Sequence, residues 1–195
     1  HPNIKIESLS GNETVGLNVS KVIPGLRDSL DLSFKSLDQI DFNNTDFIFS
    51  CLPHAELQSN FSKLPNNIKL IDLSADFRLK DSQDYNKWYG FTHNHPKKLN
   101  EFIYGLTEFN REKIKAANYI ANPGCYPTSI LMPLIPLLRN KIISGDNIIV
   151  DSKSGYSGAG KSKKTENIFA EVNENIKSYG IGDHRHTAEI NQELS

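Results

Sequence analysis

Residues 46–73 read DFIFSCLPHAELQSNFSKLPNNIKLIDL, and this stretch decides the fold class. The apolar run Asp46–Leu52 ends at a proline and is typical of a strand buried on both faces. His54–Leu64 then carries apolar residues at helical spacing up to the next proline, and Ile68–Leu73 is a second apolar run. The stretch therefore predicts a β-α-β unit.

The sequence on either side continues this alternation of strands and helices. The expected elements are strands at Ile4–Leu9, Tyr119–Ala121 and Asn147–Asp151, a helix at Arg111–Asn118, a loop-rich region at 76–107, and an apolar segment of helical character, broken by prolines, at Cys125–Asn140. Such alternation with buried strands is typical of an α/β fold with a mostly parallel sheet.

The composition excludes several classes of protein. The 195 residues include 22 Lys and Arg against 23 Asp and Glu, so no basic excess indicates a nucleic-acid partner. The longest apolar runs, such as Ile130–Leu138, are too short to span a bilayer. Two cysteines cannot form a disulfide framework, which favours a reducing compartment. We therefore expect a cytoplasmic globular protein with no membrane partner.

Both ends of the sequence indicate a piece of a longer chain. Position 1 is His rather than Met, and no signal or transit peptide follows it. Ser195 closes a helical-looking stretch that has no terminating signal. We expect an internal fragment.

Cys125 is the first candidate for chemistry. In Asn122-Pro-Gly-Cys-Tyr-Pro-Thr128 a predicted strand enters a Pro-Gly turn, and a segment of helical character follows. A cysteine at such a junction lies near the positive end of a helix, which stabilises the thiolate, and the thiolate is the nucleophile of covalent acyl chemistry. The alternative is that Cys125 is a small buried hydrophobe, the role expected of Cys51 inside its apolar strand.

A nucleophilic cysteine needs a general acid or base, and His184 and His186 are the best placed downstream residues. They could also be exposed loop residues or a metal pair. His93 and His95 show the same spacing, so a four-histidine site is conceivable. Neither pair has a carboxylate or cysteine at ligand spacing, so we predict no metal.

The segment Gly155-Tyr-Ser-Gly-Ala-Gly-Lys-Ser162 matches the phosphate-binding pattern of nucleotide-binding proteins. It predicts an anion-binding turn. A true P-loop follows its strand almost directly, whereas here Ser152-Lys-Ser154 intervene. Whether the turn binds a nucleotide stays open.

Polar residues also gather at Asp72-Leu-Ser-Ala-Asp-Phe-Arg78, where a parallel strand is expected to end. Ligands bind at this edge of α/β sheets. On the sequence alone, a set of turn and capping residues explains the segment equally well.

Taken together, these segments resemble the N-acetyl-gamma-glutamyl-phosphate reductase family of arginine biosynthesis. The matching stretches run in the family's order over almost the whole chain: Ser50-Cys-Leu-Pro-His54, Asp72-Leu-Ser-Ala-Asp-Phe-Arg78, Trp88-Tyr-Gly90, Tyr104-Gly-Leu-Thr-Glu108, Asn122-Pro-Gly-Cys-Tyr-Pro-Thr128, Lys153-Ser-Gly-Tyr-Ser-Gly-Ala-Gly160, and His184-Arg-His186 with Glu189-Ile190. The stretch around the cysteine is highly specific to this family.

The resemblance implies two domains. Residues 1–122 are expected to form a Rossmann-like dinucleotide-binding domain that lacks its first strand and Gly-rich phosphate loop. Residues 123–195 are expected to begin an α+β catalytic domain of the semialdehyde-dehydrogenase type, incomplete at its C-terminus. The full-length protein is expected to be a homo-oligomer. The family usually has Gly where this chain has Ala55, and a Cβ there would crowd a cofactor that passes close to the backbone.

The implied reaction is NADPH-dependent reduction of N-acetyl-L-glutamyl 5-phosphate to the 5-semialdehyde and phosphate, through a cysteine thioester. The resemblance assigns catalysis to Cys125, His184 and His186, and the sequence does not decide which histidine moves the proton. It assigns substrate binding to Ser154, Ser157, Gly158 and Arg185, and NADP binding to Pro53, His54, Ser74, Gly158 and Gly160.

Three alternatives stay open. A sibling enzyme of lysine biosynthesis would use the same chemistry on an aminoadipyl phosphate. A P-loop ATPase or kinase would be built on Gly155–Ser162. A noncatalytic relic would explain the missing dinucleotide fingerprint.

Overall fold

Four short strands form the sheet at the centre of the molecule. The computed structural model describes residues 2–160 and 168–195. The strand order is β3-β4-β6-β5, and every pair in this sheet is parallel. The strands are β3 (Phe47–Ser50), β4 (Lys69–Asp72), β5 (Phe102–Tyr104) and β6 (Tyr119–Ala121). The predicted α/β fold with a parallel sheet is confirmed.

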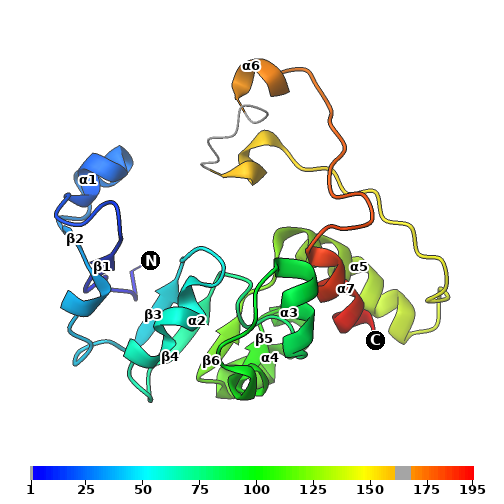
Figure 1. The fold of residues 1–195 in the computed structure, drawn as a ribbon, viewed down its shortest axis with the longest axis horizontal. Coiled ribbons are helices and arrows are strands. Elements are labelled where there is room, and N and C mark those ends of the chain that lie inside the picture. Colours follow the sequence, from blue (N-terminus) through cyan, green and yellow to red (C-terminus); the bar gives the residue numbers. More distant parts are fainter. Residues whose placement is uncertain (1, 161–167) are drawn as a thin grey trace.

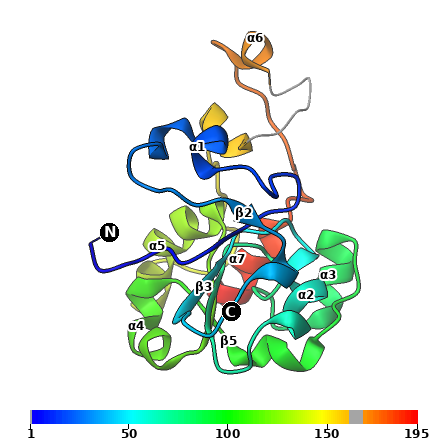
Figure 2. The ribbon, with the colours of Figure 1, turned by 90° about the vertical axis from the view of Figure 1, so that its left-hand side faces the viewer.

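Helices cover both faces of this sheet. In Figure 2, α2 (Glu56–Asn60) and α3 (Ser82–Tyr89) lie on one side, and α4 (Thr107–Ala116) and α5 (Cys125–Arg139) lie on the other. The remaining helices are α1 (Val19–Val22), α6 (Phe169–Val172) and α7 (His186–Leu194), and the 3-10 turns are η1 (Pro24–Leu26), η2 (Leu37–Gln39), η3 (Phe61–Lys63), η4 (Pro96–Glu101) and η5 (Tyr156–Ala159).

A separate two-stranded sheet precedes the central one. It pairs β1 (Leu9–Ser10) with β2 (Phe34–Lys35) in parallel, and Figure 1 shows it with α1, set apart from the four-stranded sheet.

The β-α-β unit that the sequence predicted is confirmed. β3 and β4 pair in parallel, and α2 with η3 connects them. The burial expected of the first strand is wrong, however, since Phe47 is 50% exposed and Phe49 is 56% exposed. β3 is the edge strand of the sheet, and one of its faces is left open in the part of the chain that the structure describes.

The register brings all four strands to an end at one row. Ser50 pairs with Asp72, Asp72 pairs with Ala121, and Tyr104 also pairs with Ala121. The segments that leave these strands therefore start side by side, at the edge where parallel α/β sheets bind ligands.

The loops after β3 and β4 are tied together by Asp76. This carboxylate is fully buried and accepts hydrogen bonds from the backbone N–H of Ala55 (2.7 Å) and of Gln58 (3.1 Å). Asp76 thus supplies the cap of α2 from a distant loop, because Ala55 at the N-cap position has no side chain that can do so.

A stack of aromatic rings forms the core between the sheet and its helices. Phe77 stacks on Phe102 with 4.0 Å between ring centroids and 7° between the planes. Phe61 packs against Phe77 and Tyr119, with centroids 5.3 and 5.6 Å apart. Buried side chains of Leu57, Leu70, Leu79, Tyr85 and Leu99 complete this cluster.

The region 76–107 is more regular than the sequence analysis predicted. It contains α3, η4 and β5. α3 was missed because its sequence, SQDYNKWY, is polar and short. β5 has only three residues and pairs along one edge only, with β6. The helix predicted at Arg111–Asn118 exists, but it begins earlier, at Thr107.

Three further expectations need correction. Of Ile4–Leu9 only Leu9 belongs to a strand, and Asn147–Asp151 forms none. Ile149 in that segment is 93% exposed, and no partner strand lies beside it among the described residues. Helix α5 continues through Pro133 and Pro136, although each proline removes one helical hydrogen bond.

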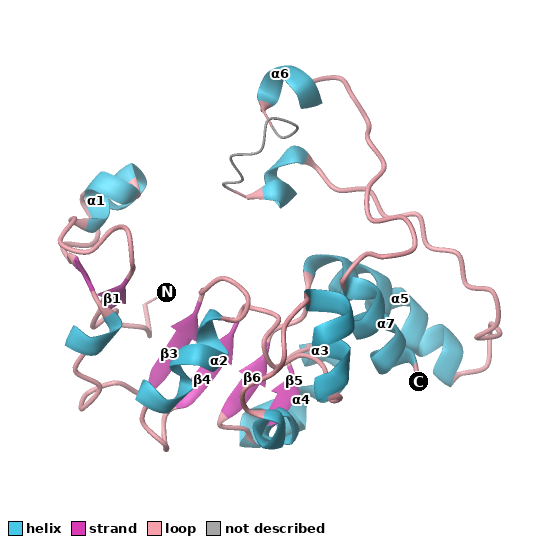
Figure 3. Cartoon of the chain, viewed as in Figure 1, coloured by secondary structure: helices cyan, strands magenta, loops and turns pink. Residues whose placement is uncertain are grey.

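Much of the chain between α5 and α7 is drawn as loop in Figure 3. This segment, 140–185, carries η5 and α6, and in Figure 1 both lie away from the sheet. In the described ranges, 2–160 and 168–195, every helix is too short or too polar to cross a membrane.

Ala55 has a left-handed backbone, with φ 70° and ψ −11°. A Cβ in this conformation costs roughly 1–2 kcal/mol, while glycine adds up to about 1 kcal/mol of freedom to the unfolded chain. We expect Ala55→Gly to raise the free energy of unfolding by about 0.5 kcal/mol in urea titrations. Ala116→Gly, in a right-handed helix, should lower it by about 0.5–1 kcal/mol. A loss of stability in Ala55→Gly would show that the left-handed backbone of Ala55 is not strained.

Candidate active site

Cys125 lies where the sequence analysis placed it, at a strand-to-helix junction. β6 ends at Ala121, Gly124 is the N-cap, and Cys125 is the first residue of the 15-residue helix α5. The residue is exposed. Its thiol therefore stands at the positive end of a long helix, at the carboxyl edge of the sheet, where an anion is stabilised.

Gly124 is in close contact with α7. A Cβ built on Gly124 would lie 2.6 Å from Nε2 of His186, which is closer than real side chains approach. The Gly124 N–H donates a 2.8 Å hydrogen bond to Oε1 of Glu189. Glycine is needed here because of this approach, while its φ of −64° is ordinary.

Glu189 joins α7 to the edge of the sheet. Its carboxylate is fully buried and also accepts a hydrogen bond from the Tyr104 hydroxyl, at 2.7 Å. Arg78 approaches it at 3.5 Å, and the same guanidinium donates to the carbonyls of Asn122 (2.7 Å) and Leu73 (2.9 Å). Burial raises the pKa of Glu189, and the Arg78 charge opposes that rise.

The sequence analysis did not identify Glu189 or Arg78 as site residues. Both belong to motifs quoted there, but they contact each other across 111 residues of the sequence, and sequence patterns do not show such a contact. Spacing offers one signal only. Glu189 follows His186 by three residues, which puts both on one face of a helix.

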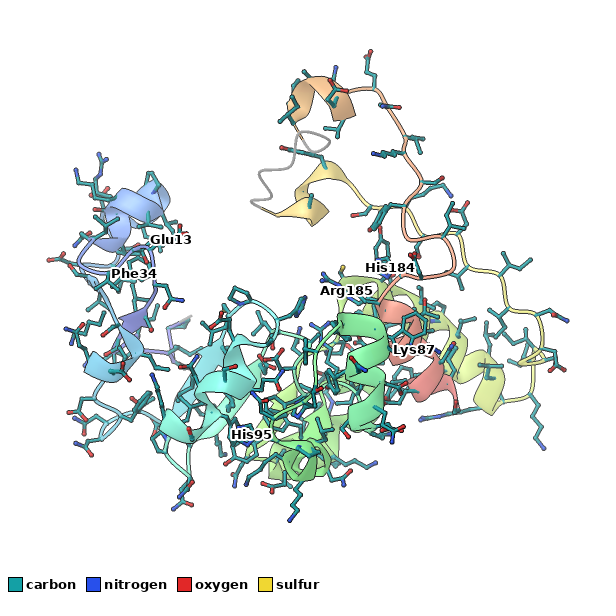
Figure 4. The ribbon with its side chains drawn as sticks, in the orientation of Figure 1. Glu13, Phe34, Lys87, His95, His184 and Arg185 are labelled. Atoms are coloured by element: carbon teal, nitrogen blue, oxygen red, sulfur yellow. The ribbon has the colours of Figure 1, made fainter. Side chains whose placement is uncertain are left out.

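The two predicted histidines lie together beside this junction. Their ring centroids are 4.9 Å apart, and His184 packs edge-on against Tyr126 at 5.3 Å. In Figure 4, His184 and Arg185 stand together where the chain enters α7. The backbone N–H of His186 donates to Nδ1 of His184, at 3.2 Å, so neutral His184 carries its hydrogen on Nε2.

Both histidines are neutral near pH 7. Burial, together with the positive charges of Arg78 and Arg185, lowers the pKa of His186 to about 3. Burial also lowers the pKa of His184, with a second contribution from Arg185. Nδ1 of His186 is buried and has no hydrogen-bond partner among the described residues.

A tyrosine pair forms one wall of the site, and the sequence analysis missed it. The Tyr179 hydroxyl donates to that of Tyr126 at 2.6 Å, and Tyr179 packs against His184. Burial raises the pKa of Tyr179 to about 12, helped by the hydrogen bond with Tyr126 and by the neighbouring Cys125. Tyr126 directly follows Cys125, but Tyr179 comes from a loop that gave no signal.

Of the residues assigned to NADP binding, Pro53 and His54 lie just beyond β3. Pro53 is exposed, and Nδ1 of half-buried His54 accepts a 3.1 Å hydrogen bond from Ala75, so its hydrogen is on Nε2. Ser74 is 2% exposed, and its hydroxyl donates to Asp72 while accepting from the Asp76 N–H. Both hydrogen bonds stabilise the turn after β4, and the buried hydroxyl is not accessible to a ligand. For Ser74, the structure therefore favours the alternative that Asp72–Arg78 is a set of turn and capping residues.

The residues assigned to substrate and phosphate binding lie in two separate places. Arg185 is exposed beside the histidines. Ser154, Ser157, Gly158 and Gly160 lie in or beside η5 and are exposed, and the structure does not bring them to Cys125. Lys161 and Ser162 of the predicted phosphate-binding turn lie outside the described residues.

The second cysteine and second histidine pair are not part of this cluster. Cys51 follows β3 and is exposed, so its expected place inside the strand is wrong. Burial and the Asp72 charge raise the pKa of its thiol. His93 and His95 bond to the carbonyls of Asp76 and Gln58. Residues 2–160 and 168–195 contain no group of three or more metal-ligand side chains.

The fold and site define an α/β protein of dinucleotide-binding type with a cysteine and two histidines at the carboxyl edge of its sheet. The family model for the NAD-binding domain of semialdehyde dehydrogenases matches residues 1–117, and the model for their dimerisation domain matches residues 125–195. The chain belongs to the semialdehyde dehydrogenase family.

Several relatives that are similar over the whole chain are named N-acetyl-gamma-glutamyl-phosphate reductase. The chain is 47% identical to that of Ehrlichia canis and 46% identical to that of Campylobacter jejuni subsp. doylei, covering 56% of each. It is 44% identical to a probable chloroplastic one of Arabidopsis thaliana and covers 49% of it. The chain thus spans about half the length of the curated relatives it matches.

The low pKa of His186 predicts acid sensitivity. A histidine with a pKa of about 3 in the folded state and an ordinary value near 6.5 in the unfolded chain favours unfolding as the pH falls from 6.5 towards 3. In denaturant titrations at pH 7 and 4.5, the parent should lose stability on acidification, and His186→Gln should lose less.

Asp72 provides the matched control of opposite sign. Burial raises its pKa to about 6, so protonation of Asp72 favours the folded state as the pH falls from 6 towards 4. Asp72→Asn should therefore lose more stability on acidification than the parent. Equal losses in the parent and in His186→Gln would contradict the burial of a neutral imidazole.

Proposed function

We propose that the protein containing this chain uses NADPH to reduce N-acetyl-L-glutamyl 5-phosphate to N-acetyl-L-glutamate 5-semialdehyde and phosphate. The observation that carries this proposal is Cys125 at the start of α5, beside two neutral histidines. The names of the relatives support the acetylglutamyl substrate over an aminoadipyl one.

In the first step, the Cys125 sulfur attacks the carbonyl carbon of the acyl phosphate. The bond between that carbon and the phosphate oxygen breaks, and its electron pair leaves with phosphate, so the acyl group becomes a thioester on Cys125. A neutral histidine accepts the thiol proton and passes it to the departing phosphate. NADPH, when bound, supplies the hydride that reduces the thioester carbonyl carbon.

We assign His184 to the oxyanion that forms when the carbonyl carbon is reduced. Its hydrogen is on Nε2, because Nδ1 accepts from the backbone, so Nε2–H can donate to the developing negative charge. Collapse of this species expels the Cys125 thiolate and leaves the aldehyde. Arg185, exposed beside the histidines, would pair with the substrate carboxylate.

The carboxyl edge of the sheet fits a dinucleotide in part. Pro53 is exposed directly beyond β3, and His54 offers an Nε2–H. These two residues would contact NADPH at the edge where α/β sheets bind dinucleotides. Ser154, Ser157, Gly158 and Gly160 would contribute only in an arrangement that places η5 against α5.

A P-loop nucleotidase is not supported. The strand expected at Asn147–Asp151 is absent, and Gly155–Gly160 forms an exposed 3-10 turn. A phosphate-binding loop of that class runs from a strand directly into a helix, and the described residues here show neither.

Assembly and location complete the proposal. The match of residues 125–195 to a dimerisation domain supports a homo-oligomer, which size-exclusion chromatography with light scattering would test. The two cysteines support a reducing compartment, and we propose the cytoplasm. The Arabidopsis relative is named chloroplastic, so cell fractionation is the decisive test of location.

The nucleophile is tested by two serine variants of the full-length protein. Cys125→Ser should lower turnover of N-acetyl-L-glutamyl 5-phosphate about 10³-fold or more, because an alcohol replaces the thiolate. Cys51→Ser should keep turnover within about threefold, as a surface substitution away from the chemistry. The loss of NADPH absorbance as the nicotinamide is oxidised measures both.

Iodoacetamide labelling followed by peptide mass spectrometry gives an independent reading. Cys125 should be labelled before Cys51, whose thiol pKa is raised by burial and by Asp72. Faster labelling of Cys51, or full turnover in Cys125→Ser, would overturn the assignment.

A further inference from the structure

One helix holds the residue before Cys125 from two sides. The Gly124 N–H donates to Oε1 of Glu189 at 2.8 Å, and the ring of His186 lies against the position that a Gly124 side chain would take. Glu189 and His186 are three residues apart on α7 and share one face of it. The place of α7 therefore determines how the chain enters α5.

The carbonyl side of Gly124 is fixed as well. It accepts hydrogen bonds from the Thr128 N–H (3.0 Å) and from the Thr128 hydroxyl (2.9 Å) in the first turn of α5. The peptide groups on both sides of Gly124 are thus anchored, one by α7 and the other by α5. The backbone of the adjoining Cys125, and with it the direction of its Cα–Cβ bond, is therefore fixed.

Glu189 is held tightly enough to act in this way. It is fully buried, and Tyr104 and Arg78 bind the carboxylate in addition to Gly124. A buried carboxylate is tolerated only when its hydrogen bonds are satisfied and its charge is paired, which leaves Glu189 one favourable arrangement.

We propose that Glu189 is a positioning residue for attack by Cys125. By holding the Gly124 N–H, it fixes the direction of the Cys125 side chain relative to His184 and His186. The turnover readout of this inference rests on the proposed function, whereas the labelling readout needs only the thiol.

Glu189 also carries a negative charge, which Arg78 pairs. The charged and titratable groups around the start of α5 are Arg78, Arg185, His184, His186, Tyr126, Tyr179 and Glu189. Removing the Glu189 charge leaves Arg78 without its counter-charge, while the reach of the side chain can be kept. Two variants of Glu189 therefore separate the effect of its charge from the effect of its side-chain length.

Glu189→Asp keeps the charge but is one methylene too short to bind Gly124 and Tyr104 together. We expect kcat to fall about tenfold or more with KM within about threefold, and the rate of iodoacetamide labelling of Cys125 at pH 7 to fall about fivefold or more, because the thiol is no longer held in one direction. Glu189→Gln keeps the reach and removes the charge. We expect it to retain about a third or more of kcat and a labelling rate within about twofold of the parent.

Glu193→Gln is the matched control, because Glu193 lies one turn further along α7, pairs with Lys80 at 4.0 Å and accepts a 2.8 Å hydrogen bond from Gln192. It should leave both readouts at the parent values. Circular dichroism of each full-length variant checks folding. Parent-like kcat in Glu189→Asp, an equal loss in Glu189→Gln, or an effect of the same size in Glu193→Gln overturns the inference.

The proposed function fails separately. A parent protein that turns over no N-acetyl-L-glutamyl 5-phosphate refutes the reductase. A slower labelling of Cys125 in Glu189→Asp, with a parent-like rate in Glu189→Gln, would still support positioning of the thiol by Glu189, and equal rates in the parent and Glu189→Asp would still overturn the inference.

Discussion

The carboxylate of Glu189 is the point at which four parts of the chain meet. It takes hydrogen bonds from the hydroxyl that ends β5 and from the N-cap of α5, and it pairs with Arg78 from the loop after β4. Gln192, one turn on, extends the same junction by bonding to Lys80 and Arg78. Without α7, these donors would be buried and unpaired, which is costly in a protein interior.

The sheet register explains why the contacts of Glu189 bring the site residues together. Because the strands end in one row at Ser50, Asp72, Ala121 and Tyr104, the loops that follow them leave from one edge. Asp76 ties two of these loops together, and Glu189 ties the others to α7. The cysteine, the histidines and the loop beyond β3 therefore meet although they lie far apart in the sequence.

Local patterns predicted the elements that local forces determine. Apolar runs identified β3, whose run ends at a proline, and β4, and the Pro-Gly turn before Cys125 identified the junction of β6 with α5. The helix α3 was missed because it is polar, although Asp81 and Gly90 cap it at either end. The burial of Glu189 and the place of Tyr179 depend on contacts more than 50 residues away, which periodicity does not report. Motif matching alone also put the stretch 155–160 at the site, whereas the structure leaves it exposed.

The proposed reaction depends on an acyl-thioester that forms on Cys125. The most direct test mixes the full-length protein with N-acetyl-L-glutamyl 5-phosphate in the absence of dinucleotide, then measures inorganic phosphate and the masses of the cysteine peptides. We expect a burst of about one phosphate per site and an acetylglutamyl adduct on the peptide that contains Cys125. No burst, or an adduct on the Cys51 peptide instead, would contradict it.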